Sequence, residues 1–375
     1  MTTQNLKDRL RKLLVTCWRN VYNKPKNILA YCVTIHNFKK DTYFPNKPLK
    51  GNFQIFLEQI WHIIKYGNIC EDYFFYGFDV KGKSKEDYVT SYFQFMIRRN
   101  ELNLNNPHNS TCILRNKFYF GILAEALGIK TPTNIAIYRN NILFDLKKKI
   151  STTVEAFLLS VPDLDIFAKP LDGECGGGVF HIYAKNGNFI GGGGGEITSI
   201  EKIIEVIRNK TYLLQWKFTQ HPKISEIYPQ SVNTIRLMTV KSKNEIHVFS
   251  AVLRIGANGI EVDNYSKGGI IVEINKDSGK LEKWGMQKQG FGTRSECHPN
   301  TLFKYEGFTI PFWKEAVKQA KSFHAMLSDI HSIGWDIAIS ETGPVFIEGN
   351  DNWEIPLAQM NRGVKKLYDR YFYNI

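Results

Sequence analysis

Three oxygen-bearing side chains near the C-terminal end of the sequence have the types and spacing of a magnesium site. Asp336 comes near the start of a short apolar run, and Glu348 comes near the end of the next run, after a turn at residues 341–343. If the two runs pair as an antiparallel hairpin, the carboxylates come side by side, and Asn350 points to the same face as Glu348. Carboxylate and amide oxygens suit a Mg²⁺ ion that also holds substrate phosphates. The pattern fits equally well a plain hairpin whose carboxylates pair with surface lysines.

A second group of residues has the chemistry of a phosphate-binding loop. Lys169 ends the predicted strand DIFAKP, and a glycine-rich turn follows, with Gly176, Gly177 and Gly178 next to one another. A lysine supplies a point charge for phosphates, and a glycine loop can close over them because it carries no side chains. Hairpins also use glycine, so the turn alone is weak evidence. Lys117, just before a predicted helix, adds a second cation and makes the combination more specific.

An apolar strand that turns polar and two strand arginines complete the candidates. The run YLLQWKFTQH can offer backbone groups to an adenine edge, although a core strand leaving its sheet has the same pattern. The residues concerned are Gln215, Trp216, Lys217 and Phe218. Arg236 and Arg254 fall on consecutive predicted strands, where a guanidinium fork can donate bidentate hydrogen bonds to a transferring phosphoryl group. A strand arginine is also often a surface salt-bridge residue.

A further pattern, Gly77 to Ser84, matches the phosphate-binding motif G-x-x-x-x-G-K-[ST]. A true site of this kind needs a buried strand entering the loop and a helix leaving it. The preceding run EDYFFYGFDV is aromatic and polar, and Phe78 and Val80 stand where the backbone must approach phosphate closely. We therefore interpret the match as a surface turn.

The order of the predicted elements indicates an α+β protein with a mainly helical N-terminal region. Apolar residues with helical spacing predict helices at residues 6–18 and 53–67. Further along the chain, helices alternate with short strands, including a hairpin around Asp277–Gly279. A strongly periodic helix at residues 311–329 precedes the two paired runs. Five consecutive glycines, residues 191–195, are interpreted as a mobile loop.

Composition is that of an ordinary globular protein, with 43% apolar and 23% charged residues among 375. The 49 basic and 36 acidic residues give a net charge of +13, which favours an anionic partner such as a nucleotide, an acidic sugar or a membrane face. No basic–aromatic repeat points to nucleic acid. The six cysteines show no paired spacing, and we expect reduced thiols without a structural zinc site.

No apolar run approaches the ~20 residues needed to span a bilayer, and no signal peptide is recognisable, so we expect a cytoplasmic protein. The basic helix at residues 6–18 fits a packing helix with a solvated basic face. Its alternative is a surface helix that meets anionic lipid, which would make the protein membrane-associated.

Five sequence elements in fixed order together resemble the ATP-grasp superfamily. They are Lys117, AKP-x-x-G-x-x-GGGV, LLQ-x-x-x-x-QHP, SVNTIR and GWDIAIS-x-x-GPVFIEGNDNWEIP. Within it, the sequence is similar over residues 85–370 to the sugar-transfer-associated ATP-grasp proteins found with bacterial surface-polysaccharide genes. The resemblance implies an ATP-grasp fold, in which two α+β lobes grip ATP. The domains expected are a helical region at 1–84, a linker segment with the first phosphate lysine at 85–165, a small lobe with the glycine loop at 166–220, and a large lobe with the magnesium site at 221–375.

The resemblance also implies roles for the matching residues. Lys117 and Lys169 contact ATP phosphates, the loop of Gly176 to Gly178 folds over them, and Gln215 to Phe218 form the hinge strand that holds adenine. The implied magnesium ligands are Asp336, Glu348 and Asn350, and the implied catalytic residues are Lys169, Arg236 and Arg254. In one departure, relatives such as the D-alanine–D-alanine ligases carry an arginine where this sequence has Gly334, so that role passes to Arg236 or Arg254. In another, Gln220 or His221 stands where a ribose-binding acid is usual.

The function implied is an ATP- and Mg²⁺-dependent carboxylate–amine ligase that forms an amide through an acyl phosphate. The family context points to decoration of a uronic-acid-bearing capsular or other surface polysaccharide, or its precursor, with an amine or amino acid. Residues 351–356 are a candidate substrate wall. The alternatives are ATP-dependent phosphoryl transfer without amide formation, and a nucleotide-binding module without turnover.

Overall fold

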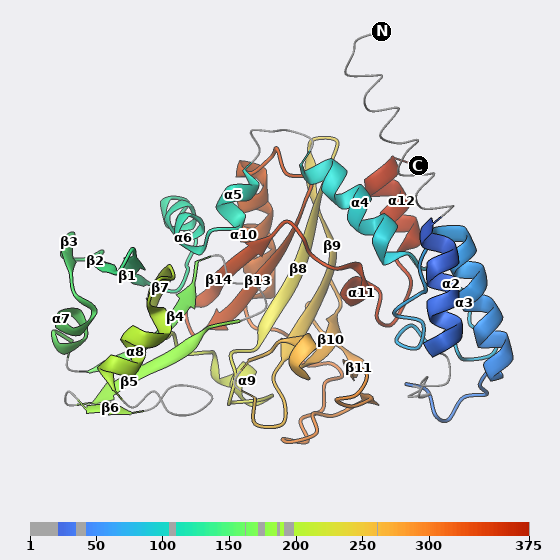
Figure 1. Ribbon diagram of the computed structural model, residues 1–375, viewed down its shortest axis with the longest axis horizontal. Helices are drawn as coiled ribbons and strands as arrows, with labels where there is room; N and C mark the ends of the chain where they lie inside the picture. The colour runs from blue at the N-terminus through green and yellow to red at the C-terminus, as the bar shows by residue number, and fades with distance from the viewer. Residues whose placement is uncertain are drawn as a thin grey trace, which may run out of the picture. The chain divides into compact units, whose positions relative to one another are not determined.

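The computed structural model describes eight stretches of the chain. They are residues 22–34, 43–104, 110–161, 163–171, 177–185, 188–190, 199–260 and 262–374. The chain divides into two compact units (Figure 1). One comprises Met1–Glu101, Gln289–Arg294 and Glu354–Ile375, and the other comprises Leu102–Lys288 and Ser295–Trp353. The predicted helix at 6–18 and the glycine run at 191–195 lie outside the described residues.

The first unit is mainly helical, as the sequence predicts for the N-terminal region. Its helices are α2 (Lys24–Thr34), α3 (Asn52–Tyr66), the start of α4 (Tyr92–Asn103), α11 (Ile355–Ala358) and α12 (Lys365–Tyr373). The predicted helix at 53–67 is confirmed as α3, and Gly67 ends it in the left-handed conformation with φ 95°, where glycine has no Cβ penalty. Helix α2 packs on α3, with the Tyr31 and Phe56 rings stacked at 5.7 Å.

The phosphate-loop pattern at Gly77 to Ser84 lies in this unit as a set of turns. Turns also precede it, and neither a strand entering it nor a helix leaving it is present among these described residues. Its phosphate-binding interpretation is therefore excluded on geometry. The expectation of a surface turn is wrong in one respect, because Phe78 is fully buried. Its ring packs edge-on against Tyr73 at 5.8 Å and Tyr88 at 5.0 Å.

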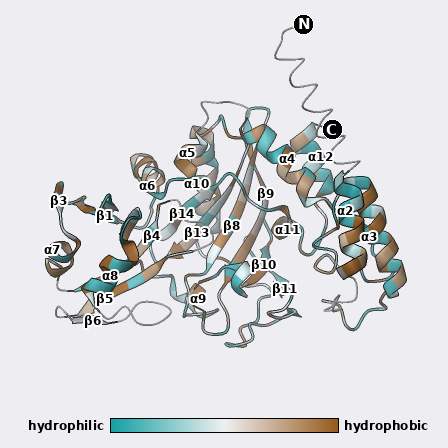
Figure 2. Ribbon diagram, in the orientation of Figure 1, coloured by the Kyte–Doolittle hydropathy of each residue, from teal (hydrophilic) through white to brown (hydrophobic). Residues whose placement is uncertain are grey.

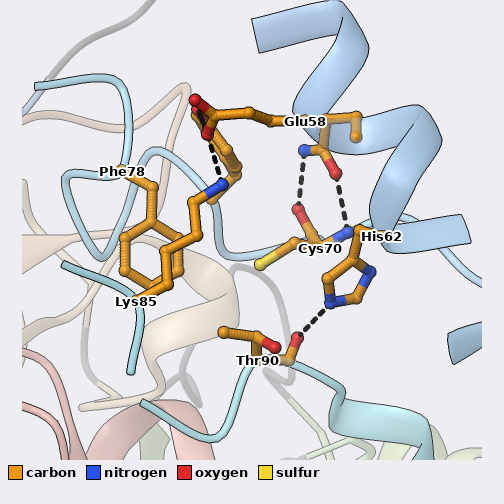
Figure 3. A pocket seen from close by; sticks show the side chains of 8 residues that line it. Glu58, His62, Cys70, Phe78, Lys85 and Thr90 are labelled. Atoms are coloured by element: carbon orange, nitrogen blue, oxygen red, sulfur yellow. Dashed lines mark hydrogen bonds and ion pairs between the residues drawn. The ribbon is translucent and has the colours of Figure 1, made fainter. Parts of the chain in front are cut away.

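Glu58 of α3 anchors a polar cluster inside the same unit (Figure 3). Tyr73 donates a 2.7 Å hydrogen bond to its carboxylate, and Lys50 pairs with it. Lys85 pairs with the same carboxylate, as Figure 3 shows. Burial raises the pKa of Glu58, but the hydrogen bonds from Lys85, Tyr73 and Lys50 outweigh burial and lower the pKa to about 2. The adjoining cavity has a volume of about 10 Å³, room for no more than one water. The cluster is therefore a structural feature of the unit.

This cluster predicts a pH-dependent contribution to stability. The folded-state pKa of Glu58 is lowered, so its contribution is present above the pKa of the unfolded chain and is lost as pH falls toward the folded value. Glu58→Gln should cost about 1–3 kcal/mol in free energy of unfolding at pH 7. The difference from wild type should shrink as pH is lowered from about 5 to about 3. Urea unfolding of both proteins across this range measures it, and a difference independent of pH would contradict the assignment.

The second unit contains two seven-stranded sheets. The first has the strand order β3-β2-β1-β7-β4-β5-β6, with every neighbour antiparallel. Its strands are β1 (Asn134–Arg139), β2 (Ile142–Asp145), β3 (Ile150–Thr152), β4 (Leu164–Pro170), β5 (Phe180–Lys185), β6 (Asn188–Ile190) and β7 (Tyr212–Trp216). Apolar side chains on one face pack against α7 (Val154–Leu159) and α8 (Ile200–Ile207). Strand alternation sends Asp165, Phe167 and Lys169 to the opposite face.

The second sheet has the order β12-β11-β10-β9-β8-β13-β14. Its strands are β8 (Thr234–Ser242), β9 (Glu245–Ile255), β10 (Ile270–Ile274), β11 (Leu281–Gln287), β12 (Arg294–Ser295), β13 (Ser332–Ser340) and β14 (Gly343–Asn350). The predicted hairpin around Asp277–Gly279 is confirmed as the β10–β11 connection, and the periodic helix is α10 (Trp313–Met326). Helix α10 lies against this sheet (Figure 1), with Phe323 stacked on Trp335 of β13 at 4.9 Å.

The unit also contains the short elements α5 (Thr111–Leu114), α9 (Pro222–Ser225) and the 3₁₀ turn η3 (Tyr265–Lys267). Helix α6 (Lys117–Ala126) packs into the core of the second sheet through Phe120. Helices and antiparallel sheets together confirm the predicted α+β class. In the described part of the chain, no helix has the length and apolar character needed to cross a bilayer. The predicted domain boundaries after residues 84, 165 and 220 stay predictions.

Candidate active site

The predicted pair of carboxylates forms at the edge of the second sheet. Strands β13 and β14 pair as an antiparallel hairpin in which Asp336 lies directly opposite Glu348, and Gly334 lies opposite Asn350. The register then shifts by one residue, so that Ile337 faces Phe346 and Ile347 forms a bulge. Such a bulge reverses the face to which the following side chains point.

The bulge determines the face of the sheet to which the Glu348 side chain points. Phe346 is fully buried in the core against Trp335 and α10, and regular alternation would send Glu348 to the same apolar face. With Ile347 inserted, Glu348 instead shares the polar face of the sheet with Asp336. Gly349 then takes the core position, where a Cβ would lie 2.7 Å from Leu114. Packing of the core thus requires glycine there and fixes the direction of the carboxylate.

Two arginines from neighbouring strands hold Asp336. Arg236 of β8 pairs with it through Nε and through Nη2 at 3.0 Å, and Arg254 of β9 donates from Nη2 at 2.8 Å. Burial raises the pKa of Asp336, but the charges of Arg236 and Arg254 outweigh burial and hold it below its usual range. Both predicted catalytic arginines therefore reach the site, and their charge is directed first at this carboxylate.

Arg236 also lies beside Gly334, the residue that stands where the D-alanine–D-alanine ligases carry an arginine. A Cβ at Gly334 would come within 2.7 Å of the Trp353 Cβ and 3.4 Å of the Arg236 Cδ. Any side chain at this position would displace buried Trp353, so an arginine does not fit at residue 334. The Arg236 side chain already occupies the adjoining space, which favours it over Arg254 for the role of the missing arginine.

Two residues that the sequence analysis missed support this network. Thr234 accepts hydrogen bonds from Arg254 at 3.0 and 2.7 Å and itself bonds to Asp263. Asp263 also pairs with Arg254 Nε at 3.4 Å. Thr234 lies two residues before Arg236, so alternation along the strand could have placed it on the polar face. Asp263 follows β9 in a loop with no motif, and only the tertiary fold brings it here.

The two predicted phosphate lysines reach the same place from different elements. Lys117 is the first residue of α6, whose N-terminus is capped by the Asn116 side chain, and its Nζ lies 3.5 Å from Glu348 Oε2. Lys169 is the next-to-last residue of β4 and lies on the polar face of the first sheet. Burial lowers the pKa of Lys169 to about 8, Lys117 acts in the same direction, and the Glu348 charge opposes both. Lys117 is thus paired with Glu348, and the charges of both residues act on Lys169.

Glu348, the acidic residue beside these lysines, has a raised pKa. Burial and the negative charge of Asp336 raise the pKa of Glu348, although Lys117 lowers it in part. Glu348 lies directly opposite Asp336 in the hairpin. Two buried carboxyl groups on one face repel each other when both are ionised, so the site gains from a bound cation.

The glycine loop lies partly within the described residues. Gly176 lies outside them, whereas Gly177 and Gly178 are described and exposed. Gly178 has φ 71°, a left-handed conformation that favours glycine, and its carbonyl accepts a 3.2 Å hydrogen bond from Tyr212. A Cβ on Gly178 would approach Pro170 to 3.0 Å, so the end of the loop lies directly beside the end of the Lys169 strand.

The predicted hinge strand leads from the first sheet to the second. Gln215 is buried, and its amide donates to Asn134 at 2.8 Å, which gives its side chain a structural role. The backbone N–H groups of Trp216 and Lys217 donate to the carbonyls of Thr133 and Asp165. Lys217 Nζ also lies 3.5 Å from the Asp165 carboxylate.

Beyond Phe218, the chain joins the second sheet. His221 donates its backbone N–H to Ile339 of β13 at 2.7 Å, and Gln220 forms a bridge with Ser340. Gln220 also turns its side chain inward to accept from the Asn233 N–H at 2.6 Å. This segment therefore connects the two sheets that carry the lysines and the carboxylates.

Comparison with known families places the chain. A model of the family described as "Sugar-transfer associated ATP-grasp" matches residues 97–370. The chain belongs to this family. The predicted ATP-grasp resemblance and fold class are thus confirmed, and the two sheets described above are those of an ATP-grasp protein. No curated protein sequence matches the chain significantly.

Solved structures of three ligases are among those similar to this ATP-grasp protein. D-alanine–D-alanine ligase from Helicobacter pylori has 15% sequence identity and a TM-score of 0.39, over 71% of this chain and 60% of the ligase. D-alanyl-alanine synthetase A from Vibrio cholerae has 10% identity and a TM-score of 0.41, over 71% and 66%. L-amino acid ligase from Bacillus licheniformis has 11% identity and a TM-score of 0.35, over 64% and 40%. The chain matches less than two thirds of the length of each.

The residues of this ATP-grasp protein fit a magnesium ion. Asp336, Glu348 and Asn350 share one face, and the Asn350 amide nitrogen faces Gly334 O and Glu348 Oε1, which leaves its oxygen for a cation. Within the described ranges, no group of three or more His, Cys, Asp or Glu side chains could hold a metal. A cation here would have to complete its shell with substrate oxygens and water, as Mg²⁺ commonly does.

The candidate substrate wall at 351–356 is largely used for packing. Asp351 is buried and takes a bidentate ion pair from Arg115, at 3.0 and 2.6 Å. Trp353 is buried against Phe249 at 5.6 Å and donates to the Ser332 hydroxyl at 3.1 Å. These two side chains therefore stabilise the end of β14, and the substrate wall stays a prediction.

Proposed function

We propose that the protein is an ATP- and Mg²⁺-dependent carboxylate–amine ligase that forms an amide through an acyl phosphate. The observation that carries the proposal is the cluster of Asp336, Glu348 and two lysines, supplied by both sheets and α6. Such a cluster combines acidic groups for a metal ion with cations for phosphates, which is the chemistry that phosphoryl transfer requires. Family membership supports the same activity class.

In this proposal the residues act mainly by position and charge. Lys117 and Lys169 bind the phosphates of ATP, and Gly177 and Gly178, with Gly176 next to them, close over these groups. The backbone from Gln215 to Phe218 faces the adenine; Phe218 and the carbonyl of Lys217 are the favoured contacts, because the N–H groups of Trp216 and Lys217 are already engaged.

Asp336, Glu348 and Asn350 would hold Mg²⁺, which when bound draws negative charge from the β- and γ-phosphates. Arg236 and Arg254 keep Asp336 ionised and in place, and Arg236, which lies beside Gly334, is the arginine proposed to stabilise the transferring phosphoryl group. A substrate carboxylate then attacks the γ-phosphoryl group, ADP leaves, and an amine displaces phosphate from the acyl phosphate.

The substrate proposed is a uronic-acid-bearing surface glycan or its precursor, joined to an amine or amino acid. The family description associates these proteins with sugar transfer, and the net charge of +13 is compatible with an acidic sugar. The test is a screen of uronic acids against amino acids, followed by ADP release and product mass. ADP release that requires both substrates, with an amide product, supports the ligase. A phosphorylated product would support phosphoryl transfer, and nucleotide binding without turnover would support a binding module.

Substitution of Lys169 tests its predicted role in ATP binding through the KM for ATP. Lys169→Ala should raise the KM for ATP by about 10–100-fold, because a charge-assisted contact with phosphate is lost from a buried site. In wild type, kcat/KM for ATP should fall above about pH 8, since the lysine keeps its charge below its pKa of about 8 and loses it above that value. Lys169→Arg should extend the profile to higher pH. An unchanged KM in the alanine variant would remove Lys169 from the site.

A further inference from the structure

One face of α3 carries large apolar side chains that remain exposed. Phe53, Leu57, Trp61 and Ile64 are exposed by 73%, 48%, 60% and 52%. Their spacing puts them on one stripe of the helix, opposite the buried residues that face the rest of the first unit. Four such residues on a single stripe differ from the scattered exposed apolar residues of an ordinary surface, and they indicate an interaction site.

The neighbouring helix α2 also carries exposed apolar side chains. Leu29 and Val33 are exposed by 67% and 68%, and Tyr22, just before the helix, is exposed by 55%. Tyr31, on the other side of α2, is buried against α3. Figure 2 shows hydrophobic residues along both helices of this pair. Each helix therefore has one apolar side that packs within the unit and a second apolar side that is exposed in the part of the chain that the structure describes.

A lysine lies over an aromatic ring on each helix. Lys26 Nζ is 5.7 Å from the Tyr22 ring centroid, and Lys65 Nζ is 5.2 Å from the Trp61 ring centroid. In both pairs the lysine follows the aromatic residue by four positions. Lysine and aromatic side chains of this kind suit a boundary between apolar and aqueous phases, because their apolar parts can be buried while the polar ends stay hydrated.

The exposed charges on the two helices have one sign. Their only acidic residue is Glu58, and its carboxylate is engaged by Lys50 and Lys85 inside the unit. The sequence that leads directly into α2, residues 1–21, contains five basic residues and a single acid, Asp8. The apolar stripes thus lie among positive charges on the helices, and the sequence that precedes α2 is also basic.

We propose that the α2–α3 pair binds the surface of an anionic bilayer, with the α3 stripe entering the headgroup region. Aromatic and aliphatic residues on one side with lysine beside them is the composition of helices that lie in a membrane interface. A protein partner fits less well, because lysine is depleted at the centre of protein interfaces. Headgroups with a net negative charge complement the lysines, and zwitterionic headgroups do not.

The test is co-sedimentation of the full chain with vesicles, without nucleotide or substrate. One set contains phosphatidylcholine alone, and the other contains phosphatidylcholine and phosphatidylglycerol in equal parts. The wild type should bind the anionic vesicles. Phe53→Ser with Trp61→Gln should lower the partition coefficient about tenfold, since two large apolar side chains no longer enter the interface. Lys26→Gln with Lys65→Gln should weaken binding to anionic vesicles and leave the weak binding to neutral ones unchanged.

A matched control removes exposed apolar side chains from helices of the other unit. Leu159 and Met326 are exposed by 60% and 59%, and Leu159→Gln with Met326→Gln should leave vesicle binding unchanged. Circular dichroism checks that each variant is folded. If the apolar variant does not fold, the lysine variant still tests the proposal.

Three outcomes would overturn the proposal. In one, wild type does not bind anionic vesicles. In another, binding survives both α2–α3 variants and depends on residues 1–21. In the third, sedimentation velocity shows a dimer that the Phe53 and Trp61 substitutions dissociate, which would assign the stripe to a second copy of the chain. None of these results bears on amide formation, so the ligase proposal is tested separately.

Discussion

Glu348→Gln should reduce turnover by a factor on the order of 10²–10³ and leave the protein folded, because the variant loses an electrostatic interaction that the transferred phosphate needs. Glutamine keeps the size of the side chain and one oxygen, and it removes the negative charge beside Asp336 and Lys117. The measurement is ADP release with the substrates found in the screen, at several Mg²⁺ concentrations. Excess Mg²⁺ should restore part of the activity if the carboxylate acts through the metal.

The same substitution should not lower stability. The pKa of Glu348 is raised in the folded protein, so its ionised form is disfavoured by folding at pH values above that pKa. Replacing it with a neutral amide removes this cost, and the melting temperature should stay level or rise. Glu341→Gln, in the exposed turn of the same hairpin, is the matched control and should change neither activity nor stability. Near-normal activity of Glu348→Gln would contradict the metal assignment.

Arg236→Met should lower the free energy of unfolding by about 3 kcal/mol, because it removes part of the charge compensation of buried Asp336. Arg254 still pairs with the carboxylate, which keeps the loss near the lower end of the range for broken buried pairs. Activity should fall as well, since Asp336 is then held less firmly on the metal face. Urea unfolding measures the first effect, and ADP release measures the second.

Arg139→Met provides the control for this prediction. Arg139 is exposed at the end of β1, so its substitution should change stability by less than about 0.5 kcal/mol. The double variant Arg236→Met with Asp336→Asn should recover part of the stability, because the buried charge is removed together with its partner. If the single Arg236 variant is as stable as the Arg139 variant, the pair seen between Arg236 and Asp336 does not stabilise the fold.

Much of the fold could be predicted because its signals are local. Helix α3 and its terminating Gly67, the β10–β11 hairpin, and the pairing of Asp336 with Glu348 all follow from residue spacing and turn residues within a few positions of one another. The candidate site residues could be selected for the same reason, since each carries a chemical group suited to phosphate or Mg²⁺ within a short motif.

Other features depend on contacts between residues far apart in the chain, and only the tertiary structure decided them. Ile347 forms a bulge because Phe346 and Gly349 must fill the core beside Trp335, and no local sequence pattern predicts this bulge. Arg236 and Asp336 are 100 residues apart, and their pairing depends on which strands become neighbours in the sheet.

The sequence by itself determined which chemical groups the protein has and which short elements carry them, because propensity, turn chemistry and periodicity act over neighbouring residues. The tertiary structure decided the direction and partners of each group. It turned both arginines toward Asp336 and set Lys117 beside Glu348, and it buried Trp353 where Gly334 leaves room. The physical reason is that strand order and core packing are settled by the whole chain at once, and the charges of the site take their positions from that packing.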